Sequence, residues 1–397
     1  MTRHVLFRAF RSGAEFTPGV HQGTVVAGEH LAYGVPAGAL HHTDSHAEHP
    51  ARCAYECCAW LSPQVAPGFG FTSLVPSWNA STPGDSWLRV EARVSTDGVS
   101  WSRWYDLGTW AEEDTEIHRS SRPGQDDGVA TVETDLLTAR AGTTWSTYQL
   151  RVVLARRPGS EAVPVVRLLG AMVSAVPDEA PAEVSRGGAA WGTELPVPPH
   201  SQQLHRGSYP QWASGGEAWC SPTSTAMLLE HWDLGPMPDE YAWVPESIPD
   251  RPVVNAVRQV FDHGYGGAGN WVFNTAFAGR YATAFVTRLR SLVEAEQLVA
   301  AGIPLVATVA FPEGGLDGAG YGTDGHLLTV IGFTESGDVV SNDPASHQVP
   351  SNDEVRVVYD RAAFERVWLG SAGGIVYVIH PTDVRLPDPP DPAEPNW

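Results

Sequence analysis

Hydrophobic and polar residues alternate along much of the first 180 residues, with the period of two that β-strands require. Residues 87–95 (Trp-Leu-Arg-Val-Glu-Ala-Arg-Val-Ser) follow this pattern and lead into Thr96-Asp97-Gly98, which is typical of a hairpin turn. Similar short runs occupy residues 148–154 and 163–169, and no helical period of any length precedes residue 180. Short strands, frequent turns and scattered tryptophans predict an all-β sandwich or jelly roll over residues 1–180.

The pattern changes after residue 180. Residues 181–200 are rich in proline, glycine and charge, which predicts an interdomain linker. The predicted helices cover 222–232, 252–263 and 285–301, and the predicted strands that follow cover 304–310, 326–333, 338–341, 355–359 and 374–379. Helices followed by strands indicate an α+β domain over 201–382. The proline- and aspartate-rich residues 383–397 predict a disordered tail.

Composition and charge limit the classes of molecule that the chain is expected to bind. The chain has 397 residues and a formal net charge of −21, which disfavours nucleic acid and anionic membranes as partners. All 25 basic residues are arginine, a bias that we attribute to a GC-rich, actinobacterial genome. The start of the chain lacks the apolar stretch of a signal peptide, and no run reaches the ~18 apolar residues of a membrane span. We therefore expect a cytoplasmic protein, or a secreted one if the start is wrongly assigned.

Four cysteines are too few for a disulfide scaffold. Three of them, Cys53, Cys57 and Cys58, follow the histidine-rich run 41–49, a combination that suggests zinc ligands. The spacing fits no familiar zinc finger, however, and contains no CxxC pair. We therefore expect no metal site and no cofactor, and read the run as a polar loop.

The fourth cysteine, Cys220, stands at the predicted start of a helix. Ser221 suits the N-cap and Pro222 the first helical position, so Cys220 would lie at the positive end of the helix dipole. A thiolate there is stabilised, and its pKa falls below the free value of about 8.5. The alternative is a buried cysteine that acts as a small hydrophobic residue.

A histidine and an aspartate follow in an order that suits nucleophilic catalysis. His326 begins an apolar strand after the glycine-rich residues 318–322, and Asp343 comes 17 residues later, one hairpin away. A carboxylate there would fix the tautomer of the imidazole, although Asn342 could do the same. Cysteine, histidine and aspartate in this order predict acyl-transfer chemistry through a thiol nucleophile.

These segments resemble a known family. Ser201-Gln202, Gly215-Gly216-Glu217-Ala218-Trp219-Cys220-Ser221-Pro222-Thr223-Ser224, Asp324-Gly325-His326 and Asn342-Asp343-Pro344 are similar to the papain-like peptidases of cysteine-peptidase family thirty-nine, over about residues 195–380. The likeness is to its stand-alone bacterial branch, related to the bacteriocin leader-processing peptidases. It implies a papain-like fold with Cys220 as nucleophile, His326 as base and Asp343 as orienting residue. It also implies that Gln202 joins the Cys220 backbone N–H in the oxyanion hole.

The predicted function is thiol-dependent hydrolysis of a peptide or protein through an acyl-thioester. Trp219, Trp271 and Tyr321 either line the substrate cleft or belong to the core. Five tryptophans of the first domain either stack on sugars or peptide or form the core of the sandwich: Trp78, Trp87, Trp101, Trp104 and Trp110. Two alternatives stay open: a transglutaminase-like acyl transferase on the same fold, and a non-catalytic protein that binds peptide or carbohydrate.

Overall fold

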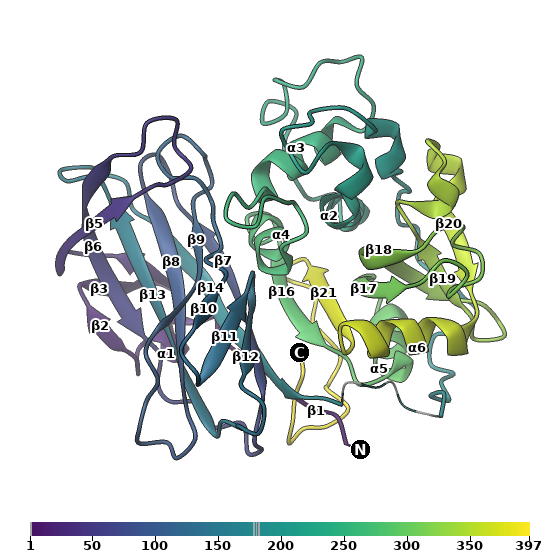
Figure 1. The fold of residues 1–397 in the computed structure, drawn as a ribbon, viewed down its shortest axis with the longest axis horizontal. Coiled ribbons are helices and arrows are strands. Elements are labelled where there is room, and N and C mark those ends of the chain that lie inside the picture. The colour runs from purple at the N-terminus through teal and green to yellow at the C-terminus, as the bar shows by residue number, and fades with distance from the viewer. Residues whose placement is uncertain (1, 178, 180, 182) are drawn as a thin grey trace. The chain divides into compact units, whose positions relative to one another are not determined.

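The computed structural model describes residues 2–177, 179, 181 and 183–397. The chain divides into two compact units (Figure 1). The first, called the β unit here, comprises Leu6–Ala175 and Asp262–Gly266. The second, called the mixed unit, comprises the described residues up to Val5, those of 176–261, and Gly267–Trp397. Each unit is described by itself below.

Two antiparallel sheets form the β unit, as the alternating pattern predicts. One has the order β10-β11-β12-β7-β14-β4-β3, with β1 also on β14, and the other has the order β2-β6-β13-β8-β9, with β5 on β6. The first sheet contains β1 (His4–Phe10), β3 (Thr24–Ala27), β4 (His30–Tyr33), β7 (Ser73–Ser81), β10 (Gln125–Asp126), β11 (Ala130–Glu133), β12 (Leu136–Ala139) and β14 (Val165–Ala175). The second contains β2 (Val20–Gln22), β5 (Gly38–Thr43), β6 (Arg52–Leu61), β8 (Trp87–Ser95), β9 (Tyr105–Trp110) and β13 (Thr147–Arg156), and a single helical turn, α1 (Gly13–Phe16), precedes β2.

The tryptophans of the β unit divide between core and surface. Trp78, Trp87 and Trp110 are at most 1% exposed and belong to the core, so these three do not form a sugar-binding surface. Trp101 and Trp104 are half-buried, and the guanidinium of Arg93 lies 4.6 Å and 4.8 Å from their ring centroids. The alternation therefore located the strands, while the depth of each ring depends on the face to which it points.

The mixed unit contains a twisted antiparallel sheet with helices around it (Figure 1). The strand order is β16-β21-β17-β18-β19-β20, with β15 on β18. The strands are β15 (Thr193–Glu194), β16 (Thr283–Arg288), β17 (Leu305–Phe311), β18 (Thr323–Phe333), β19 (Val339–Asn342), β20 (Arg356–Tyr359) and β21 (Ile375–His380). The helices are α2 (Cys220–His231), α3 (Arg251–Val260), α4 (Trp271–Ala278), α5 (Leu292–Ala300) and α6 (Arg361–Ser371), with short 3-10 turns at η1 (Gln202–His205), η2 (Gly216–Ala218), η3 (Ser346–Gln348) and η4 (Asn352–Glu354).

The predicted helix at 285–301 is wrong in its first part. Residues 283–288 form β16, which pairs with β21 along its whole length, and only Leu292–Ala300 is helical. The run Phe285-Val286-Thr287 is aromatic and β-branched, so it suits a buried strand, and the helical spacing of leucines beyond it disguised the boundary. Helices α4 and α6 were not predicted. The five strands predicted after residue 303 are all present, as β17 to β21.

The proline-rich residues 181–200 make specific contacts within the mixed unit. The carboxylate of Glu296, on α5, accepts hydrogen bonds from the backbone N–H of Gly188 and Ala189 at 2.6 Å and 2.8 Å. The same carboxylate pairs with Arg361 at 2.7 Å. Thr193–Glu194 adds a strand to β18. Much of the predicted linker therefore packs against the mixed unit.

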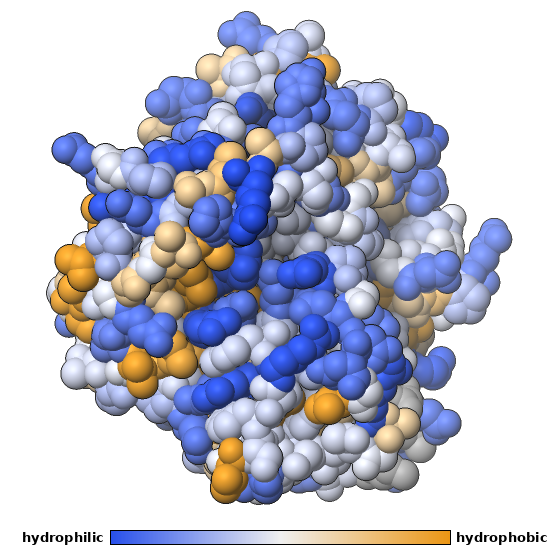
Figure 2. Space-filling view, turned by 60° about the vertical axis from the view of Figure 1, so that its left-hand side comes forward, coloured by the Kyte–Doolittle hydropathy of each residue, from blue (hydrophilic) through white to orange (hydrophobic). Residues whose placement is uncertain are grey.

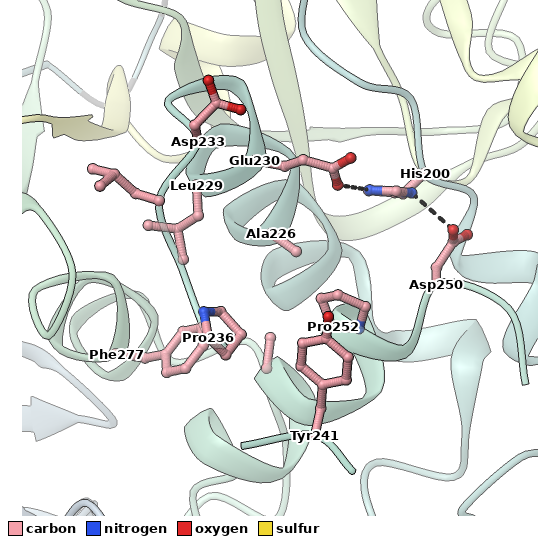
Figure 3. A pocket seen from close by; sticks show the side chains of 12 residues that line it. His200, Ala226, Leu229, Glu230, Asp233, Pro236, Tyr241, Asp250, Pro252 and Phe277 are labelled. Carbon is pink, nitrogen blue, oxygen red and sulfur yellow. Dashed lines mark hydrogen bonds and ion pairs between the residues drawn. The ribbon is translucent and has the colours of Figure 1, made fainter. Parts of the chain in front are cut away.

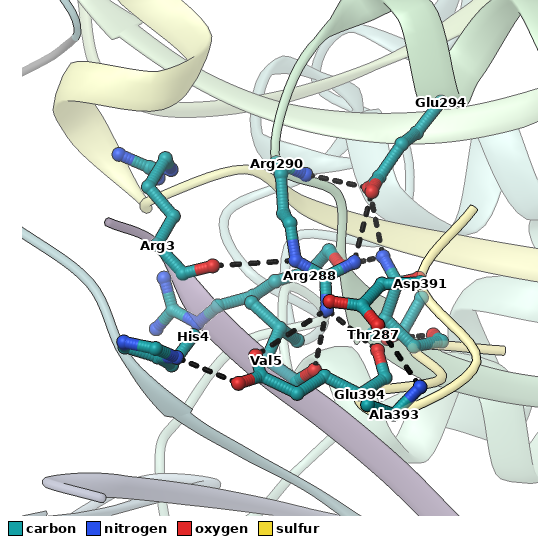
Figure 4. Close-up of polar contacts among 11 residues, drawn as sticks. Arg3, His4, Val5, Thr287, Arg288, Arg290, Glu294, Asp391, Ala393 and Glu394 are labelled. Atoms are coloured by element: carbon teal, nitrogen blue, oxygen red, sulfur yellow. Dashed lines mark hydrogen bonds and ion pairs between the residues drawn. The ribbon is translucent and has the colours of Figure 1, made fainter. Parts of the chain in front are cut away.

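The last residues of the chain also pack, which differs from the disordered tail predicted from their proline content. Asn396 is fully buried, and its side-chain amide donates to the carbonyl of Arg288 at 2.8 Å. Arg290 donates to the carbonyls of Val5 and Glu394 at 2.8 Å and 2.6 Å, which ties both ends of the chain to the same region (Figure 4). The composition misled because two residues at the very end, an asparagine and Trp397, supply the buried contacts.

The surface is largely hydrophilic. Hydrophilic residues cover most of the face in Figure 2, and hydrophobic residues form limited groups among them. Within the described part of the chain, no helix combines the length and the apolar character needed to cross a bilayer.

Candidate active site

Cys220 is the first residue of α2, as the sequence suggests, but the cap differs from the prediction. The N-cap is Trp219, with a φ of −103° and no side-chain cap hydrogen bond, so Ser221 and Pro222 lie inside the first turn. The 3-10 turn η2 delivers the chain to this position. The Cys220 side chain is 8% exposed and lies at the positive end of a three-turn helix, where a thiolate is stabilised.

His326 lies on the central strand β18, where it is 4% exposed. Its Nε2 is 2.8 Å from Oδ1 of Asp343, and its imidazole interacts electrostatically with the thiol of Cys220. Since Nε2 is engaged by the carboxylate, Nδ1 is the nitrogen left for the thiol. The strand and the helix therefore bring a cysteine, a histidine and an aspartate into one interacting line, although 106 and 17 positions separate them in sequence.

The electrostatics of this line favour an ion pair. Burial alone would lower the pKa of His326, but the charges of Asp343 and Cys220 outweigh it and raise the pKa to about 10. Burial alone would likewise raise the pKa of the Cys220 thiol, but the adjacent His326 and backbone N–H groups lower it overall. At neutral pH these directions favour a thiolate and an imidazolium.

Asp343 is fully buried and saturated with donors. Oδ1 accepts from the backbone N–H of Ala345 at 2.9 Å as well as from His326, and Oδ2 accepts from the hydroxyls of Tyr321 at 2.7 Å and Tyr359 at 2.6 Å. Burial would raise the pKa of Asp343, but His326 and these donors lower it. Burial and, after it, the charge of this carboxylate raise the pKa of both tyrosine hydroxyls.

The other candidate orienting residue, Asn342, points elsewhere. Its amide donates to the carbonyl of Val197 at 3.0 Å, and the side chain is 1% exposed. β19 ends at Asn342, and the residue that contacts His326 is Asp343, which follows the strand directly. Tyr359 was missed by the sequence analysis, since a tyrosine at the end of a strand gives no signal of its own there.

Gln202 lies beside the segment that precedes Cys220. Its Nε2 donates to the backbone carbonyl of Glu217 at 2.7 Å. A Cβ added to Gly216 would lie 2.4 Å from the carbonyl oxygen of Gln202, so only glycine permits this close approach of η1 and η2. The fold thus joins η1 and η2, which are separated by the ten residues 206–215.

The three aromatic residues expected at a cleft have different surroundings. Trp219 is fully buried, donates to the carbonyl of Trp212 at 2.8 Å and packs on His205, so it belongs to the core. The ring of Tyr321 meets that of His326 edge-on with centroids 5.4 Å apart. Trp271 is the first residue of α4 and is half-buried.

The cysteines and histidines of the β unit do not assemble into a ligand set. Cys53, Cys57 and Cys58 are free thiols on β6, and burial raises the pKa of Cys57. Across residues 2–177, 179, 181 and 183–397, no three histidine, cysteine, aspartate or glutamate side chains are grouped so that they could hold a metal ion.

Two family models match the chain. Residues 6–174 match the Peptidase C39 N-terminal domain, in its actinobacterial form, and residues 194–375 match the Peptidase_C39 like family. No curated protein is significantly similar to the chain. The second match contains the Cys220, His326 and Asp343 line, and the first coincides with the sheets of the β unit.

Proposed function

Because the chain belongs to the C39-like peptidase family, we propose that it is a cysteine peptidase with a papain-like catalytic domain. Cys220 is the nucleophile, His326 the general base and acid, and Asp343 the residue that orients the imidazole. The observation that carries this proposal is the buried line at the start of α2, in which Cys220 interacts with His326 and His326 is hydrogen-bonded to Asp343. In domain terms, residues 1–180 are an accessory β domain, and residues 201–382 are the catalytic domain.

The mechanism follows from the protonation states. The Sγ thiolate of Cys220 adds to the carbonyl carbon of a peptide bond. The resulting oxyanion accepts a hydrogen bond from the backbone N–H of Cys220. The Nδ1–H of His326 protonates the departing amine, which leaves an acyl-thioester. Neutral His326 then removes a proton from water, whose oxygen attacks the thioester and releases the acid and the thiolate.

Gln202 is the side chain that we assign to the oxyanion hole. Its amide already donates to the carbonyl of Glu217, three residues before the nucleophile, so it lies on the correct side of the loop. The amide nitrogen carries two N–H groups, and the bond to Glu217 uses one of them, so the second can donate to the oxyanion. A donor of this kind typically contributes about 100-fold or more to turnover.

The first test is alkylation of Cys220 by iodoacetamide as a function of pH, followed by mass spectrometry. We expect rapid alkylation at pH 7 in the wild-type protein and slow alkylation in His326→Ala, because the imidazolium holds the thiolate. Cys57, a free thiol whose pKa burial raises, provides an internal reference within the same sample. Equal rates for the two thiols, or no effect of His326→Ala, would contradict the proposed pair.

Hydrolysis is tested separately with a peptide library. We expect cleavage that is abolished in Cys220→Ala, and little transfer of the acyl group to added primary amines. Amine adducts in place of acids would instead identify the protein as an acyl transferase. Reactive Cys220 with neither product would point to a substrate that the library lacks, which intact bacterial proteins as substrates can resolve.

A further inference from the structure

The helices of the mixed unit line a half-open cavity of about 360 Å³ that the proposed reaction does not use. Helix α2 contributes Ala226, Leu229 and Glu230, and α3 contributes Pro252 and Ala256. Phe277 of α4 and residues of the 232–250 loop, Asp233, Leu234, Pro236, Tyr241 and Asp250, complete the wall together with His200. This volume is in the usual range for small-molecule sites.

The cavity lies on a different face of α2 from the nucleophile. Ser224, one turn after Cys220 and on the same face, donates to the carbonyl of Leu327, which adjoins His326. At 100° per residue, Leu229 and Glu230 lie roughly 120–140° around the helix from Ser224. Glu230 is also roughly 15 Å from Cys220 along the axis. The cavity is therefore a site of its own, separate from the sulfur of Cys220.

One side of the cavity is acidic and the other is apolar (Figure 3). Glu230, Asp233 and Asp250 provide three carboxylates, and His200 is the one basic residue in the lining. His200 bridges two of them, with Nε2 2.7 Å from Glu230 and Nδ1 3.2 Å from Asp250. Even with His200 protonated, the lining therefore keeps a net negative charge. Asp233 takes no part in the His200 bridge.

The bridge also holds Glu230 and Asp250 in place on the acidic side, while Asp233 is exposed beside them. His200 precedes η1, Glu230 is on α2, and Asp250 is the N-cap of α3, so one imidazole ties three segments together. Asn352 donates to the other carboxylate oxygen of Asp250 at 3.1 Å. On the opposite side, Pro236, Tyr241 and Phe277 present a surface without charge (Figure 3). A preorganised acidic side that faces an apolar wall matches a ligand with a cationic head and a hydrocarbon arm.

We propose that this cavity binds an alkylguanidinium or alkylammonium group, the chemistry of an arginine or lysine side chain. The cation lies beside Asp233 and Glu230, and the methylene arm lies against Tyr241 and Phe277. Carried by a peptide, such a side chain would anchor a substrate away from the scissile bond. This last role rests on the proposed peptidase function, whereas binding itself does not.

Binding is measured by calorimetry on the full chain that carries Cys220→Ala, so that no turnover interferes. The probes are agmatine, the blocked peptide acetyl-Gly-Arg-Gly-amide and its citrulline counterpart, which is neutral and nearly isosteric. We expect the arginine peptide to bind at least about tenfold more tightly than the citrulline peptide. Agmatine binding as tight as that of the arginine peptide would show that the side chain alone is recognised, and tighter peptide binding would identify a peptide as the ligand.

A double variant, Glu230→Gln with Asp233→Asn, should weaken arginine binding by at least about tenfold. The matched control, Glu335→Gln with Asp383→Asn, removes two exposed carboxylates elsewhere in the mixed unit and should leave binding unchanged. Thermal melts establish that both variants are folded. Equal affinity for the arginine and citrulline peptides, no binding of any probe at millimolar concentration, or unchanged binding in the folded double variant would overturn the proposal.

The result of the binding test does not depend on whether the protein is a peptidase. If alkylation and cleavage tests fail but arginine binds and the double variant does not bind it, the cavity proposal stands alone. If cleavage occurs but no cationic probe binds, the peptidase proposal stands and the cavity proposal falls.

Discussion

The hydroxyl of Tyr359 offers a quantitative test of the buried carboxylate at the centre of the site. The perturbation is Tyr359→Phe, which removes one oxygen and leaves a ring that packs on Phe364 with centroids 6.0 Å apart. That oxygen donates to Oδ2 of Asp343 at 2.6 Å, and the tyrosine is fully buried. The variant therefore removes a hydrogen bond to a charged acceptor with little change in packing.

The magnitude follows from the charge and from the remaining donor. A hydrogen bond to a charged group contributes about 1.5–3 kcal/mol to the free energy of unfolding. Because the Tyr321 hydroxyl still donates to Oδ2, the carboxylate is not left bare, and we expect the lower part of that range, about 1.5–2 kcal/mol. For a unit of this size that loss corresponds to a Tm about 3–8 °C lower.

Tyr377→Phe is the matched control. Tyr377 is also fully buried, and its hydroxyl lies 2.8 Å from that of Ser221, a neutral partner beside the nucleophile. A neutral pair contributes about 0.5–1.5 kcal/mol, so this variant should lose less stability than Tyr359→Phe. Thermal and urea unfolding of the two variants measure the difference.

A second measurement tests the connection to the nucleophile. Loss of the Tyr359 hydroxyl removes one of the two hydroxyl donors that hold Oδ2 of Asp343 in place, so the carboxylate is positioned less firmly against the His326 imidazolium. Alkylation of Cys220 at pH 7 should therefore slow in Tyr359→Phe. The reasoning is refuted if Tyr359→Phe is no less stable than Tyr377→Phe, or if it melts lower with an unchanged alkylation rate.

Three further predictions concern the same unit. Asp343→Asn should slow alkylation of the nucleophilic thiol more than any tyrosine variant, since it removes the charge that holds His326 protonated; a rate equal to that of the wild type would contradict this. Gly216→Ala should destabilise the protein by about 1–3 kcal/mol in urea unfolding, because its Cβ would press on the carbonyl of Gln202, and unaltered stability would mean that the loop gives way freely. His200 has its pKa raised to about 9 by its two carboxylates, so the stability that it contributes is fully present below its unfolded pKa of about 6.5 and is lost as pH rises through 9. His200→Gln should therefore flatten the fall of stability between pH 6.5 and 9, as measured by urea unfolding across that range.

Local pattern determined much of the architecture. Period-two alternation located strands such as β8, and the apolar runs after residue 304 located β17 to β21, because the side-chain period of a strand is read from adjacent residues. Local sequence also identified Cys220 as the candidate nucleophile, because a cysteine before Ser-Pro at the start of a helix is a signal that adjacent residues carry. Where two local patterns competed, at residues 283–300, the sequence misassigned a strand as part of a helix.

Tertiary structure decided what depends on partners distant in sequence. Whether Asp343 or Asn342 contacts His326 depends on where β19 ends beside β18, and that is fixed only by pairing with β18 and β20. The donor from Tyr359 and the packing of Asn396 arise between segments with no sequence relation. The amphipathic cavity beside α2 belongs to the same class, because its acidic and apolar sides come from three helices and a loop. A sequence specifies such contacts only through the fold as a whole, since burial and distance are properties of the packed chain.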